Sequence, residues 1–119
     1  MTEIEFEQAL VELAHVFGWH VAAFRPASTS KGWRTPVKYD GKGWPDLCLV
    51  HPTGTIIFAE LKSDVGKLSP EQTEWMDILT SAISHMDAEI YYQGWRPNNA
   101  NHIAEMLSFG KVTKWALSS

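Results

Sequence analysis

Two short apolar runs carry charged groups where a buried strand would be apolar. The first run, Gly43–Val50, contains Asp46, and the second, Ile56–Lys62, contains Glu60 and Lys62. Two neighbouring carboxylates repel each other unless a cation or a shared proton offsets them, and carboxylate oxygens are ligands that suit Mg²⁺ or Mn²⁺. A metal held in this way can activate water against a phosphodiester, and a lysine beside it can stabilise charge on the phosphate. The alternative is a structural ion-pair network at a sheet edge.

The spacing of the two runs predicts how these groups meet. His51–Thr55 separates the runs and contains Pro and Gly, which is typical of a hairpin. A three-residue loop that places His51 opposite Thr55 predicts the pairs Val50 with Ile56, Cys48 with Phe58, and Asp46 with Glu60. Side chains alternate along a strand, so Lys62 shares the face of Glu60. We therefore expect all three charged groups at one end of one sheet face, with the Leu61 carbonyl as a further metal ligand.

A helix over Glu3–Phe17 precedes this hairpin. Thr2 is a suitable N-cap and Gly18 a suitable stop. Helical geometry puts Glu3 near the centre of the apolar stripe and Glu7 at its edge, so one of them can face inward. The alternative is that acids in the first turn only complement the helix dipole. The stripe consists of Phe6, Leu10, Leu13 and Phe17.

Composition indicates one compact domain over residues 1–119, because 45% of the residues are hydrophobic and six are tryptophans. No apolar run reaches the roughly 20 residues of a membrane span, and Met1 is followed by acids, not by a signal sequence. We therefore expect an intracellular, cytoplasmic protein. The lone Cys48 lies in an apolar strand and is expected to be buried.

The net charge of −4 conceals an uneven distribution. Residues 25–67 contain seven Lys or Arg and four Asp or Glu, a balance of +3, whereas the remainder has three against ten, a balance of −7. A positive surface beside an acidic site suits a nucleic-acid substrate, although an ordinary solvated loop is the alternative. Trp33 and Trp44 could stack on bases or cap the core. The candidate nucleic-acid contacts are Lys31, Arg34, Lys38, Lys42 and Lys67.

The long segment Arg25–Gly43 shows little periodicity and is predicted to be a functional loop, after a short strand at His20–Phe24. Ser69 and Gln72 form a capping box that opens a second helix. Its predicted inward stripe shares the side of Gln72 and consists of Trp75, Leu79, Ala82 and Met86.

The rest of the chain predicts three more elements. Ala88–Tyr92 has the composition of a strand, and Pro97 opens a last helix. Val112–Leu117 could add a terminal strand or a docked tail. The buried residues expected on the last helix are Ile103, Met106 and Leu107.

Three motifs together resemble the VRR-NUC family of the PD-(D/E)XK nuclease superfamily. They are Gly43-Trp-Pro-Asp46-Leu, Phe58-Ala-Glu60-Leu-Lys62-Ser, and Gly66-Lys-Leu-Ser-Pro-Glu-Gln72. A bare Pro-Asp followed by Glu-x-Lys is common, but the added Gly, the Gly-Lys-Leu-Ser-x-x-Gln run and the Glu-rich first helix make the pattern specific. The resemblance extends from about Glu3 to Pro97.

The resemblance implies an α/β fold of the restriction-endonuclease type, with a mixed sheet flanked by helices. It implies Asp46 and Glu60 as metal ligands, Lys62 as the catalytic lysine, Gln72 near the site, and Glu3 as the first-helix acid, with Glu7 in reserve. The implied activity is a Mg²⁺- or Mn²⁺-dependent DNA endonuclease, similar to small phage enzymes and Holliday-junction resolvases.

The implied substrate is junction, flap or other branched DNA in replication, repair or recombination, cut by a homodimer. The alternative is a DNA-binding or assembly module that keeps the fold without cutting. A sequence-specific restriction-type nuclease is disfavoured, because the short chain leaves little room for a recognition subdomain.

Overall fold

The computed structural model describes residues 1–24, 27–29, 32–34 and 37–109, and the side chains of residues 1–24 and 37–108. The elements in chain order are α1 (Glu3–Val16), β1 (His20–Ala23), β2 (Ala27–Thr29), β3 (Gly32–Arg34), β4 (Leu47–His51), β5 (Thr55–Leu61), α2 (Pro70–Ser84), β6 (Glu89–Trp95), η1 (Pro97–Asn99) and α3 (Ala100–Phe109).

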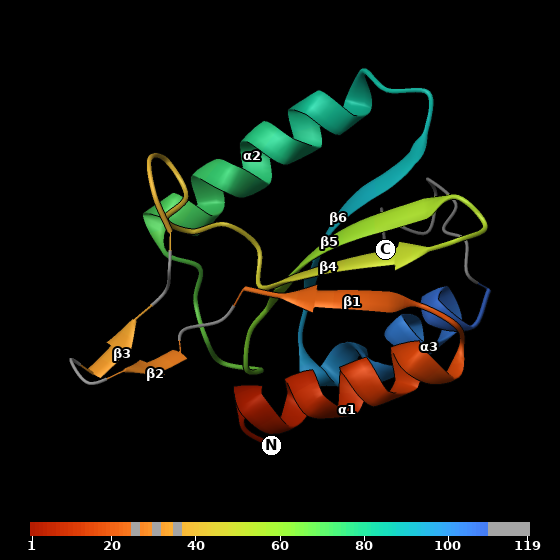
Figure 1. Cartoon of the computed structure of the whole chain (residues 1–119), viewed down its shortest axis with the longest axis horizontal. Coiled ribbons are helices and arrows are strands. Elements are labelled where there is room, and N and C mark those ends of the chain that lie inside the picture. Colours follow the sequence, from red (N-terminus) through yellow and green to blue (C-terminus); the bar gives the residue numbers. More distant parts are fainter. Residues whose placement is uncertain (25–26, 30–31, 35–36, 110–119) are drawn as a thin grey trace.

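The centre of the fold is a four-stranded mixed sheet with the order β1-β4-β5-β6. Strands β1, β4 and β5 pair antiparallel, whereas β5 and β6 pair parallel through the α2 crossover. Helices α1 and α3 lie on one side of the sheet and α2 on the other (Figure 1). The predicted mixed sheet flanked by helices is confirmed.

The predicted hairpin register is confirmed within the ladder, but the ladder ends before the predicted pair of Asp46 with Glu60. His51 pairs with Thr55, and the ladder continues through Val50 with Ile56, Cys48 with Phe58, and Leu47 with Ala59. Asp46 precedes the first residue of β4, and Glu60 is the next residue of β5 beyond the last pair. The register therefore directs Asp46 and Glu60 toward the same end of the hairpin.

Both long helices begin at the predicted caps. The Thr2 hydroxyl accepts the Glu5 N–H, and the Glu5 carboxylate accepts the Thr2 N–H. Ser69 and Gln72 form the same reciprocal pair at the start of α2. These bonds satisfy backbone donors that have no partner within the helix, which fixes where each helix begins.

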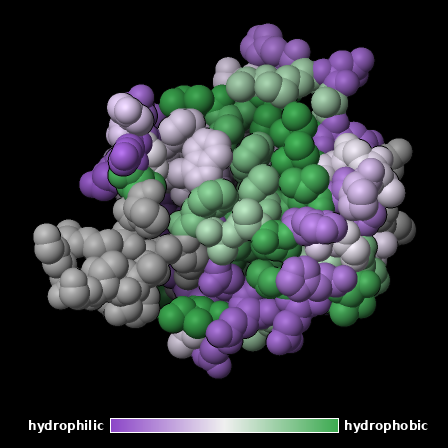
Figure 2. Space-filling view, viewed as in Figure 1, coloured by the Kyte–Doolittle hydropathy of each residue, from purple (hydrophilic) through white to green (hydrophobic). Residues whose placement is uncertain are grey.

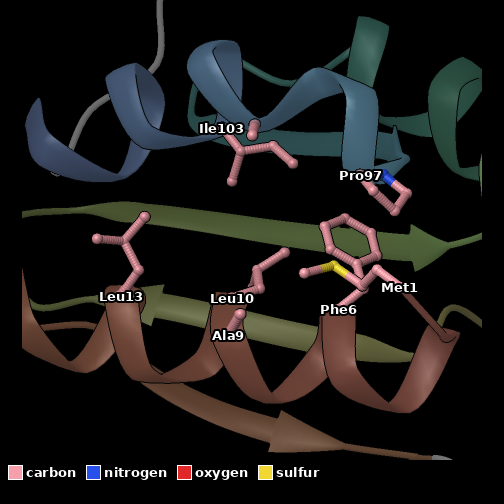
Figure 3. Close-up of a pocket in the computed structure, with 8 residues that line it drawn as sticks. Met1, Phe6, Ala9, Leu10, Leu13, Pro97 and Ile103 are labelled. Atoms are coloured by element: carbon pink, nitrogen blue, oxygen red, sulfur yellow. The ribbon is translucent and has the colours of Figure 1, made fainter.

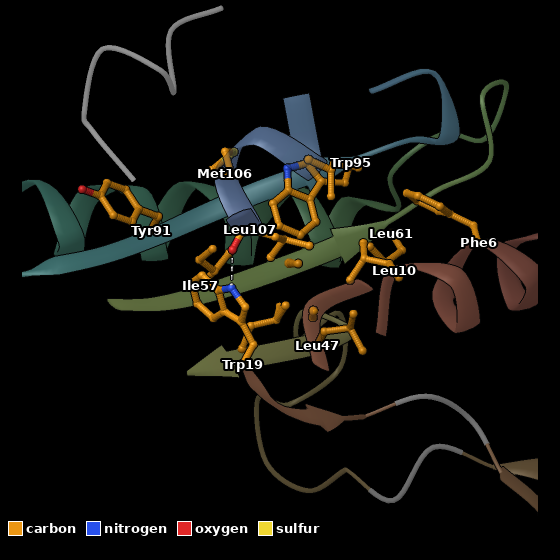
Figure 4. Packing of buried hydrophobic residues seen from close by; sticks show 14 residues of the cluster. Phe6, Leu10, Trp19, Leu47, Ile57, Leu61, Tyr91, Trp95, Met106 and Leu107 are labelled. Atoms are coloured by element: carbon orange, nitrogen blue, oxygen red, sulfur yellow. Dashed lines mark hydrogen bonds between the residues drawn. The ribbon is translucent and has the colours of Figure 1, made fainter. Parts of the chain in front are cut away.

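The core lies between the sheet and the α1–α3 layer (Figure 4). Its strand residues alternate with those of the opposite face, as a strand period of two requires. The Trp19 indole N–H donates to the Leu107 carbonyl at 2.9 Å, which joins the start of β1 to α3. Ile103, Met106 and Leu107 are buried, as predicted.

Three local predictions are wrong. The inward stripe predicted for α2 is not buried: Ala82 is exposed and Met86 is 43% exposed, because the helix contacts mainly β6 at the edge of the sheet. Cys48 is half-buried, since its sheet face is not fully covered by α2. The predicted loop Arg25–Gly43 contains the two-stranded β2–β3 sheet.

The strand predicted at Ala88–Tyr92 is longer in the structure, because β6 continues past Tyr92 to Trp95. The residues Gln93 and Gly94 interrupt the apolar pattern, but they pair in parallel with Ala59 and Glu60 of β5, and the ladder extends the strand. The predicted segment Val112–Leu117 lies outside the described residues.

Candidate active site

The Asp46 carboxylate lies across the open end of the β4–β5 hairpin. Its Oδ2 accepts the Leu61 N–H at 2.8 Å. The Asp46 carbonyl accepts the N–H of Phe24, the residue after β1, at 2.7 Å. One residue therefore joins three adjacent chain segments at this end of the sheet. The N–H and C=O of one strand residue point toward the same neighbouring strand, so the Leu61 carbonyl faces the side of Asp46 as well.

Glu60 is buried, with 1% of its surface exposed, and Gln72 orients it. Gln72 Nε2 donates to Glu60 Oε1 at 2.7 Å, and Gln72 Oε1 accepts the Ser69 N–H at 2.8 Å. The sequence left open whether Gln72 caps the helix or serves the site. In the structure the same amide caps α2 and bonds to Glu60, because its oxygen and its nitrogen point in different directions.

Lys62 and Glu3 come to this end of the sheet from different elements. Lys62 follows Glu60 by two residues, and its N–H donates to the Trp95 carbonyl at 3.1 Å. Glu3 Oε1 accepts the Ser63 N–H at 3.2 Å, so the start of α1 lies against the residue after Lys62. Glu7, the reserve candidate, is half-buried one turn further along α1.

Two residues of β6 border the site and were missed in the sequence. Tyr92 is half-buried, and burial raises the pKa of its hydroxyl well above the usual range, with the Glu60 and Asp46 carboxylates raising it further. Gly94 pairs with Glu60, and a Cβ there would meet no atom of the described residues within 4 Å. The sequence carries no signal for either residue, because only the parallel ladder with β5 brings this part of β6 beside Glu60.

The acidic pair fits a divalent cation by its chemistry. The Glu60 and Asp46 carboxylates both raise the Tyr92 pKa, as negative charges do, and a bound cation would offset such charge. Among the described residues, no group of three or more His, Cys, Asp and Glu side chains is placed to hold a metal. Mg²⁺ needs only one or two carboxylates, because it keeps several waters and uses substrate oxygens. The donor set is therefore adequate for Mg²⁺ or Mn²⁺.

The chain before Asp46 is fastened to the start of α2. A Cβ added to Gly43 would lie 2.5 Å from the Glu71 carbonyl carbon, and Gly43 has a φ of +85°. Only glycine permits both this close approach and this backbone angle. Lys42 Nζ lies 2.8 Å from Glu71 Oε1, and the Trp75 indole donates to the Asp40 carbonyl at 3.0 Å.

Trp44 packs within the same junction, edge-on against Phe58 and Trp75 with ring centroids 5.5 and 4.9 Å apart. This is the packing role that the sequence left as one alternative. The contacts fix α2, and with it Gln72, relative to the strand that follows Asp46.

The candidate nucleic-acid contacts are only partly described. Lys38 and Lys67 are exposed, and Lys42 is exposed although it pairs with Glu71. The side chains of Lys31 and Arg34 lie outside the described part of the structure. The described lysines flank the site from the segment before β4 and from the segment before α2.

A separate hollow of about 270 Å³ lies between α1 and the start of α3 (Figure 3). Its lining is Met1, Phe6, Ala9, Leu10, Leu13, Pro97, Ala100 and Ile103. None of these side chains is charged, and none is a predicted site residue. The hollow therefore lacks the groups that phosphodiester chemistry requires.

The mixed sheet with flanking helices, carrying Asp46, Glu60 and Lys62 at one end, is consistent with an α/β fold of the restriction-endonuclease type. The family model for the VRR-NUC domain matches residues 19–93, and the chain belongs to this family of PD-(D/E)XK nucleases. No curated protein and no solved structure matches the chain. Within the described residues, no helix combines the length and apolar character that a membrane span requires.

Proposed function

We propose that this nuclease is a Mg²⁺- or Mn²⁺-dependent DNA endonuclease whose site is built from Asp46, Glu60 and Lys62. The observation that carries the proposal is the arrangement at the hairpin end: Asp46 bonds to Leu61, and Glu60 is buried one residue earlier on β5. A buried acid beside a second acid is costly for a structural role alone, and it is useful where a cation binds.

Each of these residues has its own role in the proposed reaction. Asp46, Glu60 and the Leu61 carbonyl would hold the ion, which would supply a Lewis acid and lower the pKa of a water. Gln72 keeps Glu60 in one orientation through its 2.7 Å bond. Lys62 lies on the face of Glu60 and places a positive charge where negative charge develops on the phosphate. The exposed Lys38, Lys42 and Lys67 contact the DNA backbone.

The cleavage experiment compares wild type with Asp46→Asn and Lys62→Ala on labelled junction, flap, linear duplex and single-stranded DNA. We expect each variant to lose about 100-fold or more in rate, because each removes a charge used at the reacting phosphate. EDTA should abolish wild-type cleavage, and added Mg²⁺ or Mn²⁺ should restore it. The exposed Asp87→Asn, which makes the same charge change away from the site, is the matched control.

Two results would contradict the proposal. Equal cleavage by wild type and both site variants would exclude the mechanism. DNA binding by wild type without cleavage in either metal would favour the non-cleaving DNA-binding or assembly module.

We further propose that the substrate is branched DNA and that the enzyme acts as a symmetric dimer in replication, repair or recombination. One site cuts one strand, so two sites related by a two-fold axis suit a junction. Apolar surface for such contact is present: Val50, Ile78 and Met86 are 39%, 49% and 43% exposed. Figure 2 shows apolar side chains gathered over the middle of this view. The same DNA panel tests the preference, and sedimentation of the protein tests the dimer.

A further inference from the structure

The turn Ser63–Gly66 directly follows Lys62 and begins the connection from β5 to α2. This connection passes beside the start of α1 (Figure 1). Apolar packing does little to hold it, because Asp64 is exposed and Val65 is 89% exposed. Its own backbone closes the turn, because the Gly66 N–H donates to the Ser63 carbonyl at 3.2 Å, and polar contacts from other elements hold it in place.

Arg96 makes the most direct of these contacts. Its Nη1 donates to the Ser63 carbonyl and to the Gly66 carbonyl, both at 2.6 Å. A charged donor makes stronger hydrogen bonds than a neutral one, and Arg96 is half-buried, where solvent competes less. One guanidinium nitrogen thus clamps both ends of the turn.

The clamp reaches the lysine side chain through Gly66. A Cβ added to Gly66 would lie 3.4 Å from Lys62 Cδ and 3.0 Å from Ser63 Oγ. Gly66 therefore lies close beside the aliphatic stem of Lys62. Since a lysine ammonium sits on a flexible four-carbon stem, its position depends on what borders that stem.

The neighbouring contacts hold the same stretch of backbone. The Trp95 carbonyl accepts the Lys62 N–H, and Glu3 accepts the Ser63 N–H. Asp64 Oδ1 accepts the Asn98 N–H at 2.9 Å. Arg96 bonds to the turn at two points, and it follows directly after Trp95.

We propose that Arg96 is a positioning residue for Lys62: it clamps the Ser63–Gly66 turn from outside and so fixes the lysine at the site. The inference rests on the proposed function, because it assigns Arg96 a role in that reaction. Arg96 lies beyond residues 19–93, the range matched by the family model.

The test compares wild type, Arg96→Ala and Arg96→Lys, with Asp64→Ala as the matched control. Asp64→Ala removes one tether of the same turn and leaves the guanidinium in place. Amide hydrogen exchange of residues 62–66, measured without DNA, reports on the turn, and circular dichroism confirms that each variant is folded. Single-turnover and steady-state cleavage separate kcat from KM.

We expect Arg96→Ala to speed exchange in the turn by about tenfold or more, because it removes two charge-assisted bonds. It should lower kcat by about 10- to 100-fold with KM nearly unchanged, the effect of misplacing a reacting group. Arg96→Lys should recover part of both losses, since an ammonium can donate to the same carbonyls. Asp64→Ala should have a smaller effect on kcat.

Three results would overturn the inference. Unchanged exchange in Arg96→Ala would exclude the clamp. Faster exchange with unchanged kcat would exclude the positioning role, and an increase confined to KM would make Arg96 a DNA contact instead. If wild type cleaves none of the DNAs, the proposed function fails and the catalytic role of Arg96 fails with it, while faster exchange would still establish the clamp.

Discussion

The two faces of the sheet differ in how closely they are covered. The face toward α1 and α3 is closed: its residues on β4 to β6 are 0–4% exposed, apart from Gln93 at 9% and the half-buried His51 and Glu89 at one end of the sheet. The face toward α2 is looser: its apolar residues Cys48, Phe58 and Tyr92 are half-buried, and no residue of α2 is fully buried. The closed face has an apolar core, whereas the open face carries Asp46 and Glu60, and Lys62 follows directly after the end of β5.

This difference separates stability from chemistry within single strands. Neighbouring residues of β4 and β5 point to opposite faces, so Ala59 and Leu61 pack in the core while Glu60 between them faces the site. The closed layer holds the strands in register, and that register places the acids. A loosely covered face leaves the space that a metal and a phosphate need.

The largest expected effect is on stability, and it is tested by truncating one side chain on each face of the sheet. Leu49 is fully buried on the closed face, and the adjacent Val50 is 39% exposed on the open face. We expect Leu49→Ala to lower the free energy of unfolding by about 2–5 kcal/mol. Val50→Ala should lower it by less than about 1 kcal/mol. Urea titration followed by tryptophan fluorescence measures both, and equal losses would show that the two faces contribute alike.

The next effect tests the double role of Gln72 on the open face. Gln72→Glu keeps an oxygen that can accept the Ser69 N–H, but it loses the donor to Glu60 and adds a negative charge there. We expect about a 10- to 100-fold loss of cleavage, the usual cost of removing a group that orients a metal ligand. The helix cap should remain, so stability should change less than activity.

Ser69→Ala is the converse control for Gln72. It removes the Oγ that accepts the Gln72 N–H at 3.1 Å, and it should cost about 0.5–2 kcal/mol of stability. We expect it to leave most of the cleavage activity. If Ser69→Ala lost as much activity as Gln72→Glu, the cap alone would explain the glutamine.

The hairpin and its acids could be predicted because local rules determine them. The two-residue period of the strands and the short turn fix the register. The approach of Asp46 to the strand of Glu60 therefore follows from their positions in the sequence. Capping signals likewise gave the starts of α1 and α2. Helical geometry left Glu3 and Glu7 as the acids that could face inward, and in the structure Glu3 accepts the Ser63 N–H.

The remaining features depend on contacts between distant segments. The burial of α2 could not be predicted, because its stripe shows which side is apolar but not how closely the sheet approaches. Arg96 gave no signal, since its partners are backbone carbonyls 30 and 33 residues away, which carry no side-chain pattern. The strand was predicted to end at Tyr92, because only the ladder with β5 shows that Gly94 continues the sheet beside Glu60.

The smallest expected effect concerns the Tyr92 hydroxyl and the negative field of the open face. Burial, followed by Glu60 and Asp46, raises the pKa of Tyr92 above its value of about 10 in an unfolded chain. Above pH 10 the unfolded state therefore loses this proton while the folded state keeps it, so stability must fall as the pH rises. At neutral pH the hydroxyl is protonated in both states, and Tyr92→Phe should change stability little.

The prediction is thus a difference in slope, with Tyr39→Phe as the control because Tyr39 is fully exposed. Between about pH 10 and 12, wild type should lose stability more steeply than Tyr92→Phe, while Tyr39→Phe should follow wild type. Asp46→Asn should reduce the slope as well, because it removes one of the charges that raise the Tyr92 pKa. Parallel curves for all four proteins would show that the two acids do not raise the Tyr92 pKa. The open face would then lack the negative charge that a bound cation is proposed to offset.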